Sequence, residues 1–186
     1  MIEETLAEAT DKMDKAVEVA KEDFSTIRTG RATPALFSKV LVDYYGTPTQ
    51  LQQLASFGTP DARTLLITPY DVSALRAIER ALSDSEVGAN PSNDGKVIRV
   101  IMPELTQDRR KEYVKIVKTK GEDAKVSVRN IRRKAKDALD RLVKDGEIGE
   151  DDGARAEKDL DAQTKAHTEA IDDLLKRKEA ELLEVR

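Results

Sequence analysis

A row of lysine and arginine side chains is the part of this sequence best suited to chemistry. The stretch VSVRNIRRKA, residues 126–135, holds three arginines and one lysine. A guanidinium group presents a planar fork of N–H donors that fits phosphate oxygens, and it also stacks on flat rings. The stretch therefore predicts a surface that binds an anion. With its upstream continuation the row comprises Lys111, Lys115, Lys118, Lys125, Arg129, Arg132 and Lys136, with Arg133 beside it and Glu122 as its one interruption.

The spacing of this row is that of one face of a helix. Its members are three, four or seven residues apart, which at 100° per residue places them on one side, away from the apolar positions of the same segment. At 1.5 Å per residue the row is about 38 Å long. That length suits a nucleic-acid backbone better than a small anion. The alternative is that the row is only the solvated face of a helix.

The distribution of charge along the chain favours a nucleic-acid partner. The formal net charge is −4, yet residues 106–146 carry 14 Lys and Arg against 7 Asp and Glu. Residues 1–29 carry 4 against 8, and residues 147–186 carry 7 against 13. A surface that only confers solubility usually mixes both signs, whereas this row is nearly all positive. We therefore expect the row to contact RNA or DNA.

The sequence gives little support for an enzyme or a metal site. It contains no cysteine, which excludes disulfides and thiolate zinc sites and is compatible with a reducing cytosol. It has no glycine-rich phosphate loop or nucleophile elbow, and His167, its one histidine, has no second imidazole or thiol to act with. No apolar run approaches the roughly 20 residues that cross a bilayer. We expect a cytoplasmic protein with no catalytic residues, no cofactor and no metal.

A long helix is predicted at the start of the chain. Apolar residues recur at alternating steps of three and four over residues 2–27. The segment TGRATP ends this helix, because Gly30 can adopt the positive φ of a C-terminal cap and Pro34 cannot continue it. Arg28 and Arg31 flank the cap. Their side chains can bond to the last carbonyls of the helix or bind a ligand, and the sequence favours neither role.

Two further helices are predicted in the second half of the chain. Thr106 is a suitable N-cap for a helix whose apolar positions run over residues 113–142 and are weakened at Lys120 and Gly121. After a glycine-rich turn at residues 146–149, the acidic run EDD starts a third helix. Helices with one apolar seam each cannot be buried singly, so we expect an elongated three-helix bundle.

The middle of the chain has the periodicity of β-structure. KVLVDYYGTPTQL predicts a strand, a Gly-Thr-Pro turn and a second extended run, and RTLLITPY predicts a strand. VSALRAIERAL predicts a short helix, and SNDGKVIRVIM predicts a turn at Asp94-Gly95 followed by a strand that ends at Pro103. Residues 30–105 therefore form a small α+β domain inserted in a bundle of residues 1–29 and 106–186. Two tethers make a hinge, so the domain is expected to lie at an angle to the bundle. The hinge residues are Thr29, Gly30, Arg31, Pro103, Glu104, Leu105 and Thr106.

Five motifs together resemble the bacterial ribosome recycling factor family: IRTGRA, YYGTPTQLQQLASF, LTQDRRKE, RNIRRKA and EAELLEV. The resemblance covers the chain from end to end. It implies an L-shaped monomer in which the bundle binds large-subunit ribosomal RNA and a β/α/β sandwich-like domain turns about the hinge. It also implies that the protein acts with elongation factor G, which hydrolyses GTP, to split the post-termination ribosome and release mRNA and deacylated tRNA.

The resemblance also implies individual RNA-binding residues. Arg132 matches the arginine of the family that contacts RNA most prominently, and IMPELT departs from a more proline-rich family hinge, which leaves hinge stiffness open. Two other functions remain as alternatives, namely a helical scaffold for protein partners and a fragment of an RNA-modifying or tRNA-charging enzyme. The expected RNA-binding set is Arg132, Arg129, Arg133, Lys136, Arg110, Arg28, Arg31 and Lys125.

Overall fold

The computed structural model describes residues 1–27, 29–85, 87 and 90–184. The chain divides into two compact units, one formed by Met1–Phe24 and Val114–Arg186 and the other by Ser25–Tyr113. We call them the helical unit and the β unit. The helical unit is thus built from both ends of the chain, and the β unit from its middle.

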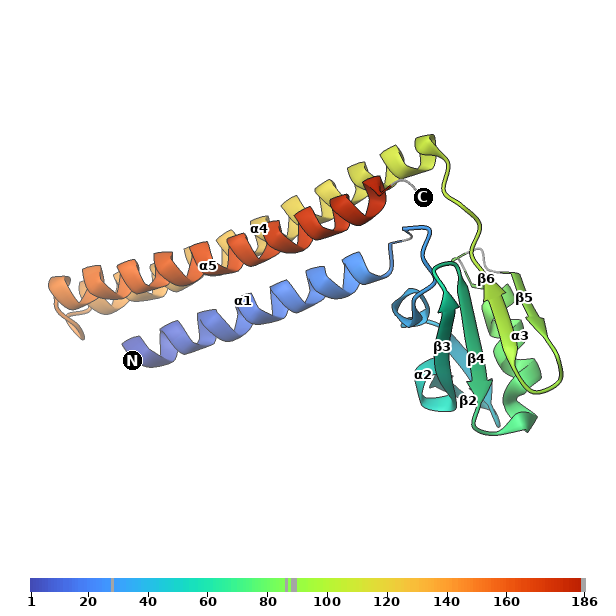
Figure 1. Cartoon of the computed structure of the whole chain (residues 1–186). Helices are drawn as coiled ribbons and strands as arrows, with labels where there is room; N and C mark the ends of the chain where they lie inside the picture. The colour runs from blue at the N-terminus through green and yellow to red at the C-terminus, as the bar shows by residue number, and fades with distance from the viewer. Residues whose placement is uncertain (28, 86, 88–89, 185–186) are drawn as a thin grey trace. The chain divides into compact units, whose positions relative to one another are not determined.

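The helical unit is a bundle of three long helices, α1 (Ile2–Ser25), α4 (Gln107–Lys144) and α5 (Glu150–Leu183) (Figure 1). The predicted bundle with an inserted sheet domain is therefore confirmed. Its core follows the apolar seams and contains several small side chains, which lets the helices approach closely. The buried members are Ala9, Met13, Val128, Ala135, Leu139, Ala156, Leu160 and Ile171.

The start of α4 and the link to α5 are set by local chemistry. The backbone N–H of Arg109 donates to Thr106 Oγ1 at 3.2 Å, so Thr106 is the N-cap that the sequence predicts. Gly146 adopts a φ of +74° in the link between α4 and α5, a conformation that glycine reaches without strain. Acidic side chains fill the first turn of α5, where they complement the helix dipole.

Two glycines are points of close helix packing. A Cβ atom on Gly121 of α4 would lie 3.4 Å from Leu175 and 3.6 Å from Phe24. The expectation that Gly121 weakens the seam is therefore wrong, because its missing side chain makes room for these two residues. A Cβ atom on Gly153 of α5 would lie 2.6 Å from Val143 Cγ2, a distance at which no side chain fits. Both glycines let larger residues of a neighbouring helix fill the bundle.

The first helix ends earlier than the sequence predicts. Helix α1 stops at Ser25, before the TGRATP segment. Thr26 and Ile27 are β-branched and lose rotamer freedom in a helix, which disfavours continuation. Gly30 does adopt a positive φ, of +88°, but it lies beyond the helix and does not cap it.

The β unit contains a hairpin and a four-stranded antiparallel sheet (Figure 1). Strands β1 (Leu41–Tyr44) and β2 (Thr47–Gln50) form the hairpin. The larger sheet has the order β3-β4-β6-β5. Its strands are β3 (Ala55–Asp61), β4 (Thr64–Pro69), β5 (Asn90–Asn93) and β6 (Ile98–Ile101).

Helical segments complete the β unit. They are the 3-10 turns Pro34–Phe37 and Val72–Ala74, the short helix α2 (Leu51–Leu54) and helix α3 (Leu75–Ser83). Helix α3 buries Leu75, Ile78 and Leu82 in the same core as the strand residues Leu65, Ile67, Ile98 and Val100. The predicted short helix and the strands at RTLLITPY and VIRVI are confirmed.

Two details of the β unit differ from the sequence prediction. The hairpin turns at Tyr45 (φ 51°) and Gly46 (φ 81°), so the predicted Gly-Thr-Pro turn is wrong and Thr47 and Pro48 already belong to β2. Pro48 is tolerated because β2 pairs on one side only, within a two-stranded sheet. Strand β3 is not predicted, because Gly58 and a proline interrupt its pattern. Its pairing with β4 is irregular from Gly58 onward.

None of the helices in the described ranges is both long and apolar enough to span a membrane. Among the same residues, no group of three or more His, Cys, Asp or Glu side chains is arranged to hold a metal ion.

Candidate RNA-binding surface

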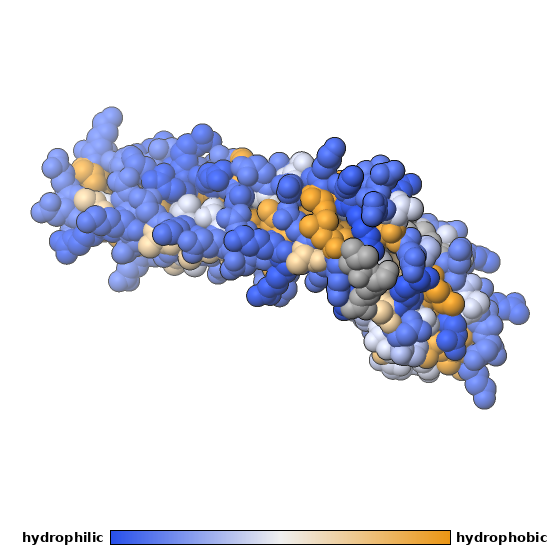
Figure 2. Space-filling model, turned by 45° about the horizontal axis from the view of Figure 1, so that its top comes forward, coloured by the Kyte–Doolittle hydropathy of each residue, from blue (hydrophilic) through white to orange (hydrophobic). Residues whose placement is uncertain are grey.

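Helix α4 gathers five of the predicted RNA-binding residues within about three turns. The same helix is fixed in the bundle by the buried residues Val128, Ala135 and Leu139. The surface of the helices is mainly hydrophilic on the face shown in Figure 2. The five residues on α4 are Lys125, Arg129, Arg132, Arg133 and Lys136.

Three basic residues of α4, spaced seven apart, pair with acidic residues of α5. Lys118 Nζ lies 3.9 Å from Glu179, Lys125 Nζ lies 3.0 Å from Asp172, and Arg132 Nε lies 2.6 Å from Asp161. The spacing of seven keeps them on the side of α4 that faces α5, as in the charged flanks of a coiled coil. We call Lys118, Lys125 and Arg132 the cross-helix row.

Lys125 is the most enclosed member of the cross-helix row. Its side chain is 18% exposed, and its Nζ contacts Glu122 at 3.4 Å as well as Asp172. The hydrogen bond to Asp172 raises the pKa of Lys125 above its usual value, despite some desolvation. The ammonium group is therefore held between two carboxylates, which limits its freedom to meet a ligand.

Arg132 lies at the boundary between the bundle and solvent. Its Nε donates to Asp161 Oδ1 at 2.6 Å, and its Nη2 lies 3.9 Å from Glu157. Its side chain is 32% exposed. The bond to Asp161 raises the pKa of the guanidinium. One edge of the fork thus faces α5, and the remaining donors are available to a ligand.

The other basic residues of this surface pair within α4 itself. Arg129 Nη1 lies 3.2 Å from Glu122, and its side chain is 54% exposed. Arg133 is exposed and donates from Nη2 to Asn130 at 3.2 Å. Lys136 Nζ donates to Asp140 at 3.0 Å. We call Arg129, Arg133 and Lys136 the outer row.

The pairs of the outer row shift the pKa values of the groups that form them. A hydrogen bond from Arg129, with a further one from Lys125, holds the pKa of Glu122 below its usual value. The bond to Asp140 raises the pKa of Lys136. These pairs are solvent-exposed and therefore contribute little to stability. They are weak enough for a phosphate to replace the carboxylate.

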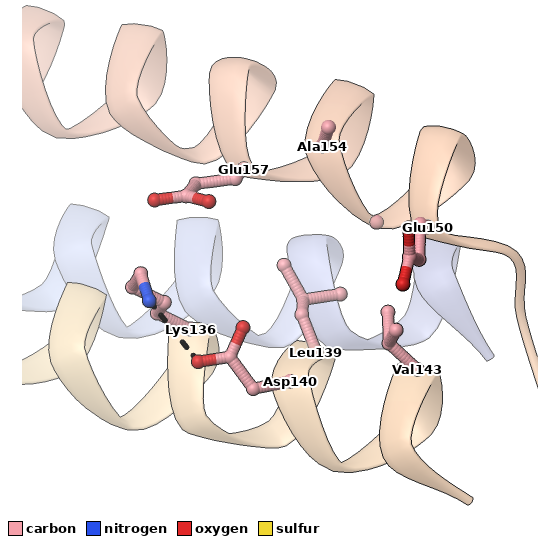
Figure 3. Close-up of a pocket in the computed structure, with 8 residues that line it drawn as sticks. Lys136, Leu139, Asp140, Val143, Glu150, Ala154 and Glu157 are labelled. Atoms are coloured by element: carbon pink, nitrogen blue, oxygen red, sulfur yellow. Dashed lines mark hydrogen bonds and ion pairs between the residues drawn. The ribbon is translucent and has the colours of Figure 1, made fainter. Parts of the chain in front are cut away.

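A small cavity of about 240 Å³ lies beside Lys136 between α4 and α5 (Figure 3). Its apolar wall includes Leu139 and Val143. Figure 3 shows the carboxylates of Asp140, Glu150 and Glu157 around it, with Lys136 as the one labelled cation. An anion is therefore disfavoured inside this cavity, and the basic surface is confined to the outside of α4.

Both predicted tethers are bonded to one turn of the β unit. The Ala32 N–H donates to the Ala62 carbonyl at 2.8 Å, and the Met102 N–H donates to the Arg63 carbonyl at 2.7 Å. The Arg63 side chain donates from Nε to the Met102 carbonyl at 3.0 Å and from Nη1 to Glu104 at 2.9 Å. Arg63 was not identified from the sequence, where it is an isolated arginine beside a strand.

The remaining predicted residues lie near these tethers. A Cβ atom on Gly30 would lie 3.9 Å from Leu105, so the two tethers run side by side. Arg31 is partly buried, and Arg110 Nε donates to the Leu105 carbonyl at 3.4 Å. Both belong to the β unit. Arg28 lies outside the described residues.

His167 joins two helices of the bundle. Its Nε2 lies 2.6 Å from Asp14 Oδ1 of α1, and its Nδ1 lies 2.6 Å from the Gln163 carbonyl of α5. Its side chain is 14% exposed. This is the position of a residue that packs between helices.

Comparison with known proteins identifies the family. The family model for ribosome recycling factor matches residues 20–183. The chain is 80% identical over 185 residues to the ribosome-recycling factor of Arthrobacter sp. strain FB24, and the match covers 100% of both chains. The chain belongs to the ribosome recycling factor family. The resemblance drawn from the five motifs is thereby confirmed.

Solved structures of ribosome recycling factors have the same fold. A solution structure of a ribosome recycling factor matches with a TM-score of 0.82 and 37% identity, covering 99% of this chain and 98% of the other. A second match has a TM-score of 0.72 and 40% identity, covering 99% and 100%. It belongs to models for the T. thermophilus ribosome recycling factor and the E. coli elongation factor G bound to the E. coli post-termination complex.

The acidic partners of the basic surface, Asp161, Glu157 and Asp172, are not predicted from the sequence. In the sequence they are three of the 13 acidic residues of the segment 147–186. The apolar seam of α5 carries a usable signal, because it orients the helix and so indicates which acidic residues flank α4. Pairing them with particular lysines and arginines requires the register between the helices, which a seam alone does not fix.

Proposed function

We propose that this chain recycles ribosomes after termination, in the cytoplasm and as a monomer. The outer surface of α4 binds large-subunit ribosomal RNA, and elongation factor G, which hydrolyses GTP, acts on the β unit. Together they split the ribosome into subunits and release mRNA and deacylated tRNA. The chain itself supplies binding and leverage rather than catalysis.

Family membership over the whole chain supports the recycling role, as does a 40% identical neighbour that is described with elongation factor G on a post-termination complex. The observation that carries the RNA contact is the cluster of Arg129, Arg132, Arg133 and Lys136 along α4. These residues project donors from a rigid, packed helix. Exposed carboxylates now occupy some of those donors, and phosphate oxygens can replace them.

The proposed RNA-binding residues differ in their surroundings. Arg132, Arg129, Arg133 and Lys136 are placed to contact phosphates directly. Lys125, held between two carboxylates, contributes mainly by supporting the surface. Arg110, Arg31 and Arg28 extend the set toward the tethers in sequence.

The two tethers, residues 29–31 and 103–106, are the proposed hinge. The residues next to these tethers, Ala32 and Met102, are bonded to the turn at Ala62 and Arg63, which ties them to the sheet. Bending is therefore expected on the far side of these bonds, at Gly30 and Leu105. Gly30 already occupies a region of φ that other residues rarely adopt.

The test is binding of the purified protein to vacant ribosomes across a salt series, with Arg132→Ala measured beside the wild type. Each neutralised phosphate releases counterions, so we expect binding to weaken steeply with salt and to be weaker for the variant. A flat salt dependence with no effect of the variant would instead support the protein scaffold. A recycling assay with elongation factor G and GTP, read by subunit splitting, tests the remaining steps.

A further inference from the structure

The acidic residues of α5 that face Arg132 are the feature from which a further role follows. Asp161 accepts from Nε at 2.6 Å, and Glu157 lies 3.9 Å from Nη2. Both carboxylates therefore address the same edge of the guanidinium. Their side chains are 50% and 40% exposed, so they are in contact with solvent while they hold the arginine.

Stability does not account for this arrangement. Ion pairs between solvent-accessible side chains contribute little to folding, and Arg132 flanks the core of the bundle rather than lying in it. The pair does have a direct effect on the ligand-binding capacity of Arg132. A carboxylate and a phosphate use the same N–H donors, so a phosphate that approaches the Nε edge must first displace Asp161.

We propose that Asp161, with Glu157, determines the specificity of the basic surface for its RNA. The two carboxylates hold Arg132 in one orientation and leave its outward donors for phosphates that match this orientation. RNA of other geometry must displace Asp161 and meets its negative charge, which weakens non-specific binding. This proposal rests on the proposed function, since it concerns the same RNA-binding surface.

Two other acidic residues of α5 provide a matched control. Asp159 and Asp173 are exposed, and within the described part of the chain no ion pair joins either to a basic residue. At 100° per residue, Asp159 lies about 200° around the helix from Asp161. Replacing Asp159 and Asp173 removes the same charge from α5 without releasing Arg132.

The experiment measures binding to poly(U) and to vacant ribosomes across a salt series, with fluorescently labelled protein. We expect Glu157→Gln/Asp161→Asn to bind poly(U) about fivefold more tightly, with a salt slope steeper by about 0.7 because one more cation meets a phosphate of a single strand. Its affinity for ribosomes should change by less than about twofold. The ratio of the affinity for ribosomes to the affinity for poly(U) therefore falls.

Three comparisons decide the proposal. Asp159→Asn/Asp173→Asn should leave the poly(U) slope unchanged, and the same gain in this variant would mean that only net charge matters. In an Arg132→Ala background, Asp161→Asn should have no effect on poly(U) binding, because the released cation is absent. Glu157 is kept in this comparison because it also attracts Lys136. The proposal would be overturned if poly(U) affinity still increased in the Arg132→Ala background, or if Glu157→Gln/Asp161→Asn increased the affinity for ribosomes as much as that for poly(U).

Two further measurements keep the outcome interpretable. Asp161→Asn alone should give about half of the logarithmic gain in poly(U) affinity, and circular dichroism checks that each variant keeps its helices. The poly(U) readout does not depend on recycling. A flat salt response of wild type and Arg132→Ala on ribosomes would therefore refute the proposed function by itself, whatever the poly(U) result.

Discussion

The cross-helix row and the outer row of α4 contain the same kinds of side chain at similar spacing, but their surroundings differ. Lys118, Lys125 and Arg132 form ion pairs with acidic residues of α5, while Arg129, Arg133 and Lys136 form their ion pairs and hydrogen bonds with residues of α4 in the described structure. A uniformly basic face in the sequence is thus divided by a neighbouring helix. The inner part is held by α5, and the outer part is the more open of the two to the proposed RNA ligand. Four comparisons of variants test this division.

The largest expected effect is on the packing beside the cross-helix row. Gly121→Leu should destabilise the protein by about 2–3 kcal/mol, because its side chain meets Leu175 and Phe24 in a filled core. Thermal unfolding followed by circular dichroism measures this loss. Arg133→Leu, on the outer row, is the control and should change stability by less than about 0.5 kcal/mol. Equal losses would show that the two sides of α4 do not differ in packing.

The second test compares ligand binding by one member of each row. Arg132→Ala should weaken binding to vacant ribosomes about tenfold, which corresponds to about 1.4 kcal/mol. Arg133→Ala should weaken it about two- to threefold, because its guanidinium is less restrained before binding and loses more freedom. Both should keep the wild-type circular dichroism spectrum. If Arg133→Ala costs as much as Arg132→Ala, the restraint by α5 has no influence on affinity.

The third test removes the partner of Lys125. Asp172→Asn should destabilise the protein by about 1 kcal/mol, since the ammonium is largely enclosed and keeps only Glu122 as a neutralising contact. Asp173→Asn changes the adjacent, exposed position and should be nearly neutral. Chemical denaturation of both variants distinguishes them. Equal denaturation midpoints for the two variants would show that the Lys125–Asp172 pair contributes as little to stability as the exposed pairs of the outer row.

The smallest expected effect is on the pH dependence of stability. Asp172 raises the pKa of Lys125. The contribution of Lys125 to stability is therefore complete below pH 10.5 and is lost as pH rises through the higher folded-state pKa. Burial lowers the pKa of Lys178 on α5, so the unfolded state binds more protons and stability rises as pH approaches 10.5. Relative to Lys125→Met, wild type should thus lose stability by a few tenths of a kcal/mol above pH 10.5. Relative to Lys178→Met, it should gain as pH rises toward 10.5. The free energy of unfolding is measured by chemical denaturation at each pH. If the differences from Lys125→Met and from Lys178→Met change with pH in the same direction, the opposite pKa shifts of the two lysines are contradicted.

The sequence predicts the helices, the sheet domain and the basic face because each depends on local periodicity. The seam of α4, for example, orients Arg129 and Arg133 away from the core before any contact is known. The pairs Arg132–Asp161 and Lys125–Asp172 depend on how α5 lies against α4, which is set by the link between them and by Gly153. The role of Gly121 was misjudged for the same reason. Its packing involves Leu175 and Phe24, which come from two other helices.

The insertion of the β unit between α1 and α4 determines the order in which the protein can fold during its synthesis. Residues 26–106 separate the end of α1 from the start of α4, which is several seconds of synthesis at roughly 5–20 residues per second. During that time α1 has no helical partner for its seam, and an isolated helix of this kind is only marginally stable. The β unit has its own core and can fold while α4 is still being made. The bundle therefore forms last, when α5 leaves the ribosome on which the protein is made, and the nascent α1 must remain unpaired until then.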